Sequence, residues 1–181
     1  MMYAVASLLD LESDAFTRKM WDWIQTVCGK ADITLSPIPH FSWLIGEELD
    51  LDQTKSILEI LSKETMPFEI GINGIGIFTG QYPVMYLSLM KSKQMAKLHQ
   101  TIWDQIPILK SGSGEYYHPD KWIPHITLAY HATDQDRLTC AVQGLVFDFR
   151  EIRISVQQIG VIYQNENDYG IAMNFNFDGS N

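Results

Sequence analysis

A six-residue pattern occurs twice in the chain, and the distance between its copies constrains the fold more than any other feature. Residues 39–44 read Pro-His-Phe-Ser-Trp-Leu, and residues 124–129 read Pro-His-Ile-Thr-Leu-Ala. The two histidines lie 85 positions apart in a chain of 181 residues, which is nearly half its length. A single His-x-Ser/Thr occurs by chance in most proteins. A matched pair at this spacing predicts a fold built from two related halves.

The segments around the two copies also repeat in kind. Apolar residues at intervals of three and four predict helices, and continuous or alternating apolar runs predict strands. Pro107 ends the third helix, and Thr133 with Asp136 forms a capping box before the fourth. The expected strands are residues 3–10, 39–46, 68–78, 84–90, 122–130, 149–163 and 169–177, and the expected helices are 14–28, 52–63, 92–106 and 134–144. The order is strand-helix-strand-helix-strand, twice, with one extra strand.

The third strand of each half shares an unusual detail. Its apolar positions change parity once, across Asn73-Gly74 in the first half and across Gln157-Gln158 in the second. A change of parity is typical of a β-bulge. An Asn-Gly pair also suits a hairpin turn, but the parallel change in the other half favours the bulge. An apolar-Gly-apolar triplet follows in both, at Gly76 and Gly160, which are 84 positions apart.

These repeats predict an α+β protein with two lobes. The duplicated halves are related by a pseudo-two-fold, and their antiparallel-rich sheets surround a central cleft. Hydrophobic residues make up 46% of the chain and charged residues 19%, which is typical of a packed globular core. We expect residues 1–181 to form a single bilobal domain, with one lobe at about 1–80 and the other at about 81–181.

The net charge of −9 argues against a long nucleic acid as partner, because gripping a phosphate backbone takes many Lys and Arg contacts. Bases nevertheless outnumber acids between residues 91 and 121. The lysines there are Lys91, Lys93, Lys97, Lys110 and Lys121. This set is either a solvated helix face with a loop or a less repulsive approach for a small anion. We expect neither long double-stranded nucleic acid nor a membrane as partner.

The sequence also predicts a cytoplasmic protein. Its longest apolar runs are far shorter than a membrane span, and its first ten residues lack the basic region of a signal peptide. Cys28 and Cys140 are the only cysteines, and each occupies an apolar helical position. We expect buried free thiols in a reducing compartment rather than a bridge.

Strand alternation places each histidine of the repeat beside its hydroxyl. His40 shares a face with Ser42, and His125 shares a face with Thr127, while the bulky apolar neighbours point to the opposite face. If the two faces meet across the pseudo-two-fold, the four side chains surround one small group. The plain alternative is that the histidines are hydrogen-bonded boundary residues. A zinc site is a second alternative, but the chain has no Cys pair or His-x-x-x-His spacing, and hydroxyls are poor zinc ligands.

The paired motifs resemble those of the two-histidine phosphoesterase superfamily, in particular its bacterial RNA 2′,5′-ligase or 2′,3′-cyclic phosphodiesterase branch. The resemblance covers essentially the whole chain, and residues 122–129, Trp-Ile-Pro-His-Ile-Thr-Leu-Ala, are especially similar to that branch. It implies a bilobal α+β fold, hydrolysis of cyclic phosphodiesters without metal or cofactor, and catalytic roles for His40, Ser42, His125 and Thr127. Tyr130 stands where many ligase-like members have Arg, so it is a candidate substrate contact.

The residue types suit this chemistry. Opening a cyclic phosphate takes a base that activates water and an acid that protonates the leaving oxygen, and imidazole, with a pKa of about 6.5, serves in either role. The two hydroxyls can donate to the non-bridging oxygens and stabilise the charge of the transition state. The near-symmetry leaves the roles of the histidines open; of the two assignments we favour His125 as base and His40 as acid.

Loop 110–120 enters the second motif strand and is the expected place for substrate contacts. Its Tyr116 and Tyr117 offer flat faces on which a base could stack, and Lys121 follows them. Alternatively, the tyrosines pack down and only hold the loop still. Of the remaining histidines, His131 lies too far along its strand, His118 lies in the loop, and His99 occupies the shoulder of a helical stripe and is interpreted as a boundary residue.

Two functions from different classes follow. The first is a phosphoesterase acting on a 2′,3′-cyclic phosphate or a 2′,5′-linked end of a nucleotide or RNA. The second is a non-catalytic protein that uses the same cleft to bind a nucleotide or an RNA end. The presence of both histidines favours the enzyme, because a binding protein needs only one of them or a fixed cation.

Overall fold

The computed structural model describes residues 1–29, 38–106, 108, 112–129, 135–147, 152–165 and 168–179. The strands are β1 (Met2–Leu8), β2 (His40–Gly46), β3 (Phe68–Phe78), β4 (Val84–Leu89), β5 (His125–Ala129), β6 (Ile152–Val156), β7 (Gln158–Gln164) and β8 (Tyr169–Asn176). The helices are α1 (Leu11–Val27), α2 (Leu51–Glu64), α3 (Lys93–Gln105) and α4 (Gln135–Val146), and a 3₁₀ helix, η2, spans Gly112–Tyr117. The expected order of strands and helices is confirmed, except that the expected strand 149–163 is two strands, β6 and β7.

The strands form two antiparallel sheets of four. One sheet has the order β2-β1-β7-β8 and the other has the order β5-β4-β3-β6. The expected α+β fold with antiparallel sheets is therefore confirmed. The two expected lobes, 1–80 and 81–181, are segments of sequence, and each sheet takes strands from both of them: β3 pairs with β4, and β7 pairs with β1.

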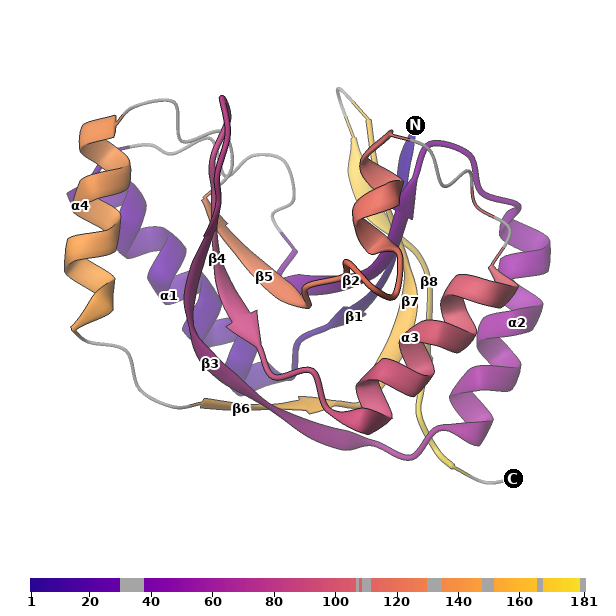
Figure 1. The fold of residues 1–181 in the computed structure, drawn as a ribbon. Helices are drawn as coiled ribbons and strands as arrows, with labels where there is room; N and C mark the ends of the chain where they lie inside the picture. The colour runs from indigo at the N-terminus through magenta and orange to yellow at the C-terminus, as the bar shows by residue number, and fades with distance from the viewer. Residues whose placement is uncertain are drawn as a thin grey trace.

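The two halves of the chain pair within one sheet, where β3 lies beside β6. Ile70 lies opposite Ile154 in this register, and these residues are 84 positions apart, the same separation as Gly76 and Gly160. Ile70 and Ile154 occupy equivalent positions in the two halves. Equivalent residues pair with each other only beside the axis that relates the halves, so this pair marks the pseudo-two-fold axis. Helices cover the outer sides: α1 and α4 lie outside β3 and β4, while α2 and α3 lie on the other side of the molecule (Figure 1).

One of the two expected bulges is correct and the other is wrong. The register of β3 against β4 shifts between Ile72 and Gly74, as a bulge requires. At Gln157, however, one strand ends and another begins: β6 belongs to the sheet of β3, and β7 belongs to the sheet of β1. A strand that leaves one sheet for another also changes the face its apolar side chains must cover. Parity alone does not separate these two cases.

Polar caps begin the first three helices. The Asp10 carboxylate accepts from the backbone N–H groups of Glu12 and Ser13 and caps α1, which therefore begins three residues before the expected start at residue 14. It also accepts from Ser155 N–H at 2.8 Å, which ties the start of α1 to β6. Asp50 and Ser92 cap α2 and α3 in the same way. Among the described residues, no helix combines the length and apolar character needed to cross a membrane. The expected capping box at Thr133 lies outside the described residues.

The expectation of free thiols is wrong, because Cys28 and Cys140 form a disulfide. Cys28 is the C-cap of α1 and Cys140 lies in α4, and their Cα atoms are 5.7 Å apart, within the usual range for a bridge. The two helices pack closely because Gly144 leaves room for the Trp23 ring; a Cβ at Gly144 would lie 1.9 Å from that ring. The helical pattern predicted that each cysteine lies at an apolar position, but only the packing of α1 on α4 brings the two together.

Removing this bridge should destabilise the fold. The two cysteines are 112 positions apart, so the bridge closes a long loop and restricts the unfolded chain. We expect the double variant Cys28→Ser/Cys140→Ser to lose about 2–5 kcal/mol of the free energy of unfolding, measured by urea denaturation. Dithiothreitol should lower the midpoint of the wild-type protein and leave that of the variant unchanged. Equal wild-type midpoints with and without reductant would contradict the bridge.

Candidate active site

The two repeated motifs form the inner edge strands of the two sheets. His40 and Ser42 lie on β2 and His125 and Thr127 lie on β5, and these two strands contact each other. In both strands the histidine and the hydroxyl residue are partly exposed, while the residue between them is buried. This is the division of faces that alternation predicts. Two edge strands that meet in this way bring both motifs to one place.

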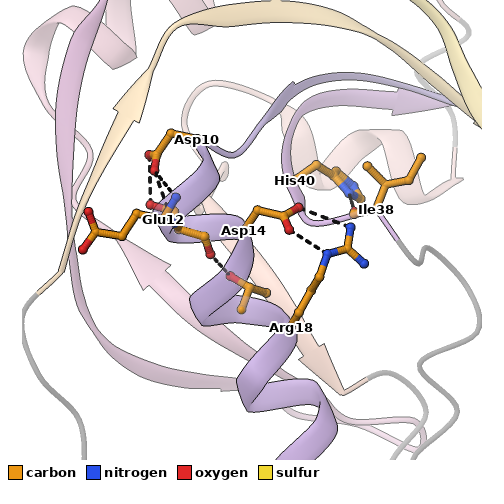
Figure 2. Close-up of polar contacts among 8 residues, drawn as sticks. Asp10, Glu12, Asp14, Arg18, Ile38 and His40 are labelled. Atoms are coloured by element: carbon orange, nitrogen blue, oxygen red, sulfur yellow. Dashed lines mark hydrogen bonds and ion pairs between the residues drawn. The ribbon is translucent and has the colours of Figure 1, made fainter.

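The two imidazole rings are held in the same manner. His40 Nδ1 lies 2.7 Å from the carbonyl oxygen of Ile38, and His125 Nδ1 lies 2.7 Å from the carbonyl oxygen of Ile123. Figure 2 shows Ile38 beside the His40 ring. A carbonyl oxygen only accepts, so the proton of each neutral ring sits on Nδ1. Nε2 then carries the lone pair, and each ring can take a proton at Nε2 or, once charged, release it there.

The motif backbones are anchored crosswise. The Trp122 indole, which precedes β5, donates to the carbonyl oxygen of Ser42 at 3.2 Å, and the Trp21 indole of α1 donates to the carbonyl oxygen of Thr127 at 3.0 Å. Each hydroxyl residue is therefore fixed by an indole from outside its own sheet. These hydrogen bonds hold the backbone at both hydroxyl residues and leave their side chains uninvolved in the anchoring.

The surroundings of His125 are aromatic. Its ring meets Phe78 edge-on at 4.9 Å and lies 5.1 Å from Tyr86, and Phe78 stacks on Tyr86 at 4.2 Å. Gly76 allows this arrangement, because a Cβ there would lie 2.3 Å from the Tyr86 ring. The aromatic pair limits the rotation of the imidazole and shields it from water. Burial also raises the pKa of Tyr86.

Burial lowers the pKa of both motif histidines. For His40, desolvation is the main cause, the carbonyl of Ile38 opposes it, and the positive charge of His125 lowers the pKa further. For His125, desolvation is again the main cause and the carbonyl of Ile123 opposes it. The effect of one ring on the other shows that they are close neighbours. Because like charges repel, the pair favours at most one imidazolium at a time.

Comparison with known proteins identifies the family of this chain. The family model of the 2′-5′ RNA ligase superfamily matches residues 14–168. The chain belongs to the 2′-5′ RNA ligase superfamily. No curated protein sequence matches the chain. The recognition made from the paired motifs is therefore confirmed.

Solved structures share the fold of this superfamily member. The crystal structure of the protein TT0787 of Thermus thermophilus is 18% identical, with a TM-score of 0.69 and 98% of each chain covered. The crystal structure of a phosphoesterase is 12% identical, with a TM-score of 0.58, covering 97% of this chain and 98% of the other. Membership of the superfamily supports an enzyme of the two-histidine phosphoesterase type.

The remaining candidate site residues predicted from the sequence differ in exposure and in contacts. Tyr116 is 73% exposed, and Lys121 is exposed on the turn that follows η2. Tyr117 is partly buried, and burial raises its pKa to about 12, although the Ser42 side chain partly opposes this. The two tyrosines therefore differ in setting, and only Tyr116 offers an exposed ring. Tyr130 and His131 lie outside the described residues. Among the described residues, no three His, Cys, Asp or Glu side chains gather as a metal site would require.

The Arg18 guanidinium lies near the first motif. It forms an ion pair with Asp14 on α1, with Nε 2.6 Å from a carboxylate oxygen. In Figure 2 the Arg18 side chain extends from α1 toward the segment that carries Ile38 and His40. Because half of this side chain is exposed, the ion pair adds little stability.

His99 is the residue that sequence reasoning placed wrongly. It is not a boundary residue but fully buried, at 0% exposure, and its ring stacks on Trp122 at 3.7 Å with 10° between the planes. Neither ring nitrogen has a hydrogen bond of normal geometry among the described residues. Burial, together with the charge of Lys91, lowers the pKa of His99 to about 4, although backbone groups of Trp43 and Tyr117 partly oppose this.

His99 should make the fold sensitive to acid. Its pKa is lower in the folded protein than in the unfolded chain, so the unfolded state binds more protons below about pH 6.5 and stability falls with pH until about pH 4. Between pH 7 and pH 5 we expect the wild-type protein to lose about 2 kcal/mol more of its free energy of unfolding than His99→Phe, measured by urea denaturation. Equal losses in the two proteins would contradict the buried neutral ring.

Proposed function

We propose that the protein hydrolyses 2′,3′-cyclic phosphates, or 2′,5′-linked ends, of nucleotides or RNA by two-histidine acid–base catalysis. The observation that carries this proposal is the matched arrangement of His40 and His125 on contacting strands, each with Nδ1 against the backbone carbonyl of the residue two positions before it. Because a positive charge on His125 lowers the pKa of His40, protonation of one ring favours a neutral second ring. That is the state in which one ring serves as base and the other as acid.

The reaction on a cyclic phosphate balances as follows. The neutral imidazole takes a proton from water, whose oxygen forms a bond to phosphorus. The bond from phosphorus to one ribose oxygen breaks on the opposite side, and the imidazolium gives that oxygen its proton. The product is a phosphate monoester with a free neighbouring hydroxyl, and solvent exchange returns the two rings to their starting states. We keep His125 as base and His40 as acid, and Ser42 and Thr127 as donors to the non-bridging oxygens.

Both histidines should be essential, and the pH optimum should be acidic. The profile of kcat/KM against pH reports the free enzyme, in which burial lowers the pKa of each ring, so we expect a bell with its maximum below about pH 6.5. His40→Ala and His125→Ala should each lower kcat about 10²–10⁴-fold on a nucleoside 2′,3′-cyclic phosphate. Activity should survive EDTA. Full activity of either variant, or loss with EDTA and recovery with zinc, would overturn the proposal.

A substrate with a good leaving group separates the roles of the two rings. A p-nitrophenyl phosphodiester expels a weakly basic phenolate, which needs no general acid, but water still needs a base. We therefore expect His40→Ala to recover most of its lost rate on this substrate and His125→Ala to stay inactive. The opposite result would identify His40 as the base and His125 as the acid. Binding of a cyclic nucleotide by the wild-type protein without turnover would instead support the non-catalytic alternative.

Tyr116 and Lys121 are the residues we assign to the nucleotide end of the substrate, together with Tyr130. The exposed Tyr116 ring offers a face for a base, and stacking on an aromatic side chain is worth about 1–3 kcal/mol. Tyr116→Ala should therefore raise KM for a cyclic nucleotide about tenfold and change kcat little. A base-free cyclic phosphate is the matched control, and an equal effect on both substrates would show that Tyr116 does not contact the base.

The partner we propose is thus a small nucleotide or an RNA terminus, and the place of action is the cytoplasm. The location remains a prediction, and the cysteine pair provides its test, since disulfides persist in oxidising compartments and are rare in the cytosol. Alkylation of thiols in intact cells should find Cys28 and Cys140 reduced if the protein works in the cytoplasm. A bridged pair would place it in an oxidising compartment.

A further inference from the structure

One hydrogen bond joins the segments of the two histidine motifs directly. The Trp122 indole, three residues before His125, donates to the carbonyl oxygen of Ser42 at 3.2 Å. Ser42 lies on β2, two residues after His40. The bond therefore runs from the segment that leads into β5 to the strand that carries the other imidazole.

Trp122 also precedes the carbonyl group that orients the His125 ring. Ile123 follows Trp122 directly, and its carbonyl oxygen lies 2.7 Å from His125 Nδ1. A continuous path thus leads from Ser42 through the Trp122 indole and the Ile123 carbonyl to the imidazole. A shift of the indole relative to β2 would shift the carbonyl that holds the ring.

The Trp122 ring is packed against two other rings. It is 3% exposed, and it stacks on His99 of α3 with the ring centres 3.7 Å apart and on Trp43 of β2 with the centres 5.5 Å apart. The Lys91 ammonium lies 5.5 Å from the centre of the Trp122 ring. Buried rings in close packing hold one orientation, so the indole N–H is a fixed point between the two motifs.

This link breaks the symmetry of the two halves. Trp122 stands 85 positions after Pro37, the same separation as that of the two histidines, and a proline side chain has no donor. The second indole bond at the site, from Trp21 to the carbonyl oxygen of Thr127, comes from α1 and not from the other motif. The two indoles therefore hold the motifs in different ways.

The reaction proposed above depends on the separation of the two imidazoles. One ring works on each side of phosphorus, so an error in their separation spoils one proton transfer whenever the other is well placed. The strands β2 and β5 contact each other but belong to different sheets, so no ladder of backbone hydrogen bonds sets their distance. A side-chain contact between the two motif segments supplies what the sheets do not.

We propose that Trp122 is a positioning residue that fixes the separation of the His40 and His125 rings across the substrate phosphate. This inference rests on the proposed function, in which both rings transfer protons in one reaction. Trp122 is not itself catalytic, because its ring is buried and its N–H is bound to the carbonyl oxygen of Ser42. It acts through β2 at one end and through Ile123 at the other.

The test compares two substrates in Trp122→Phe, which keeps an aromatic ring and removes the N–H. A nucleoside 2′,3′-cyclic phosphate needs both imidazoles, whereas a p-nitrophenyl phosphodiester needs only the base. We expect kcat to fall about tenfold to a hundredfold on the cyclic phosphate, with little change in KM, and less than about threefold on the nitrophenyl substrate. The ratio of the two rates does not depend on the folded fraction, so a general loss of stability leaves it unchanged. Equal losses on both substrates would overturn the inference.

Two further variants separate the hydrogen bond from the packing. Trp21→Phe also removes an indole bond to a motif carbonyl, but one that comes from α1, so it should keep the wild-type ratio of the two rates even if both rates fall. Replacing Trp122 by benzothienylalanine preserves the size and shape of the ring and removes only the donor, so the ratio should change as it does in Trp122→Phe. A wild-type ratio in the benzothienylalanine protein would refute the positioning role, as would the same change of ratio in Trp21→Phe.

A binding measurement keeps this inference distinct from the proposed function. Calorimetry with inorganic phosphate as the probe should show weaker binding to Trp122→Phe than to the wild-type protein. The difference should vanish in the His40→Ala background, where a single ring has no separation to keep. If the wild-type protein does not turn over cyclic phosphates but shows this pattern, the hydrolysis proposal fails and the positioning role stands. If the wild-type protein is active and Trp122→Phe keeps its ratio of rates, the positioning role fails alone.

Discussion

The antiparallel pairing of β3 with β6 is the contact on which the site depends. Ile70 faces its own counterpart Ile154 across this pairing, so it sets the axis that relates the two halves. From that axis β3 runs on to pair with β4, and the chain after Gln157 runs on to pair with β1. Each half thus completes the sheet of the other. The strands left at the inner edges, β2 and β5, carry the histidines and face each other because of this exchange.

Two indole hydrogen bonds hold the edge strands that carry the site. An edge strand has one neighbour in its sheet and would be the least constrained part of it. Here each edge strand receives an additional hydrogen bond from an indole, from Trp122 to the carbonyl of Ser42 and from Trp21 to the carbonyl of Thr127. Proton transfer needs heavy atoms placed within hydrogen-bonding distance. The two indoles hold the motif backbones through their carbonyl groups, which contributes to that placement.

The sequence predicted what depends on local pattern. Periodicity and the duplication predicted the helices and strands, the bulge at Gly74, the faces of the motif strands and the antiparallel sheets. It could not predict what depends on packing between distant elements. The change of parity at Gln157 has the same signature whether a strand bulges or changes sheet, and the bridge from Cys28 to Cys140 exists only because α1 and α4 cover the same sheet.

The same limit applies to two residues near the site. His99 follows Leu98 on α3, and a helical stripe shows that its ring lies close to the core but not that Trp122 covers it completely. Tyr116 and Tyr117 are adjacent and chemically identical, so composition assigns both to one role. The last turn of η2 separates them, because one ring is exposed and the other is partly buried.

Residues that differ between the two halves give the two motifs different roles. Duplication alone would give two equivalent rings and two equivalent hydroxyls, and equivalent groups have no reason to divide into acid and base. In the folded protein the His125 ring is enclosed by Phe78 and Tyr86, whereas the strand that carries His40 and Ser42 packs against η2. The two motifs therefore have different neighbours. A reaction that moves a proton in on one side of phosphorus and out on the other needs this kind of difference. The pseudo-two-fold therefore brings the groups together, and the residues that break it distinguish their roles.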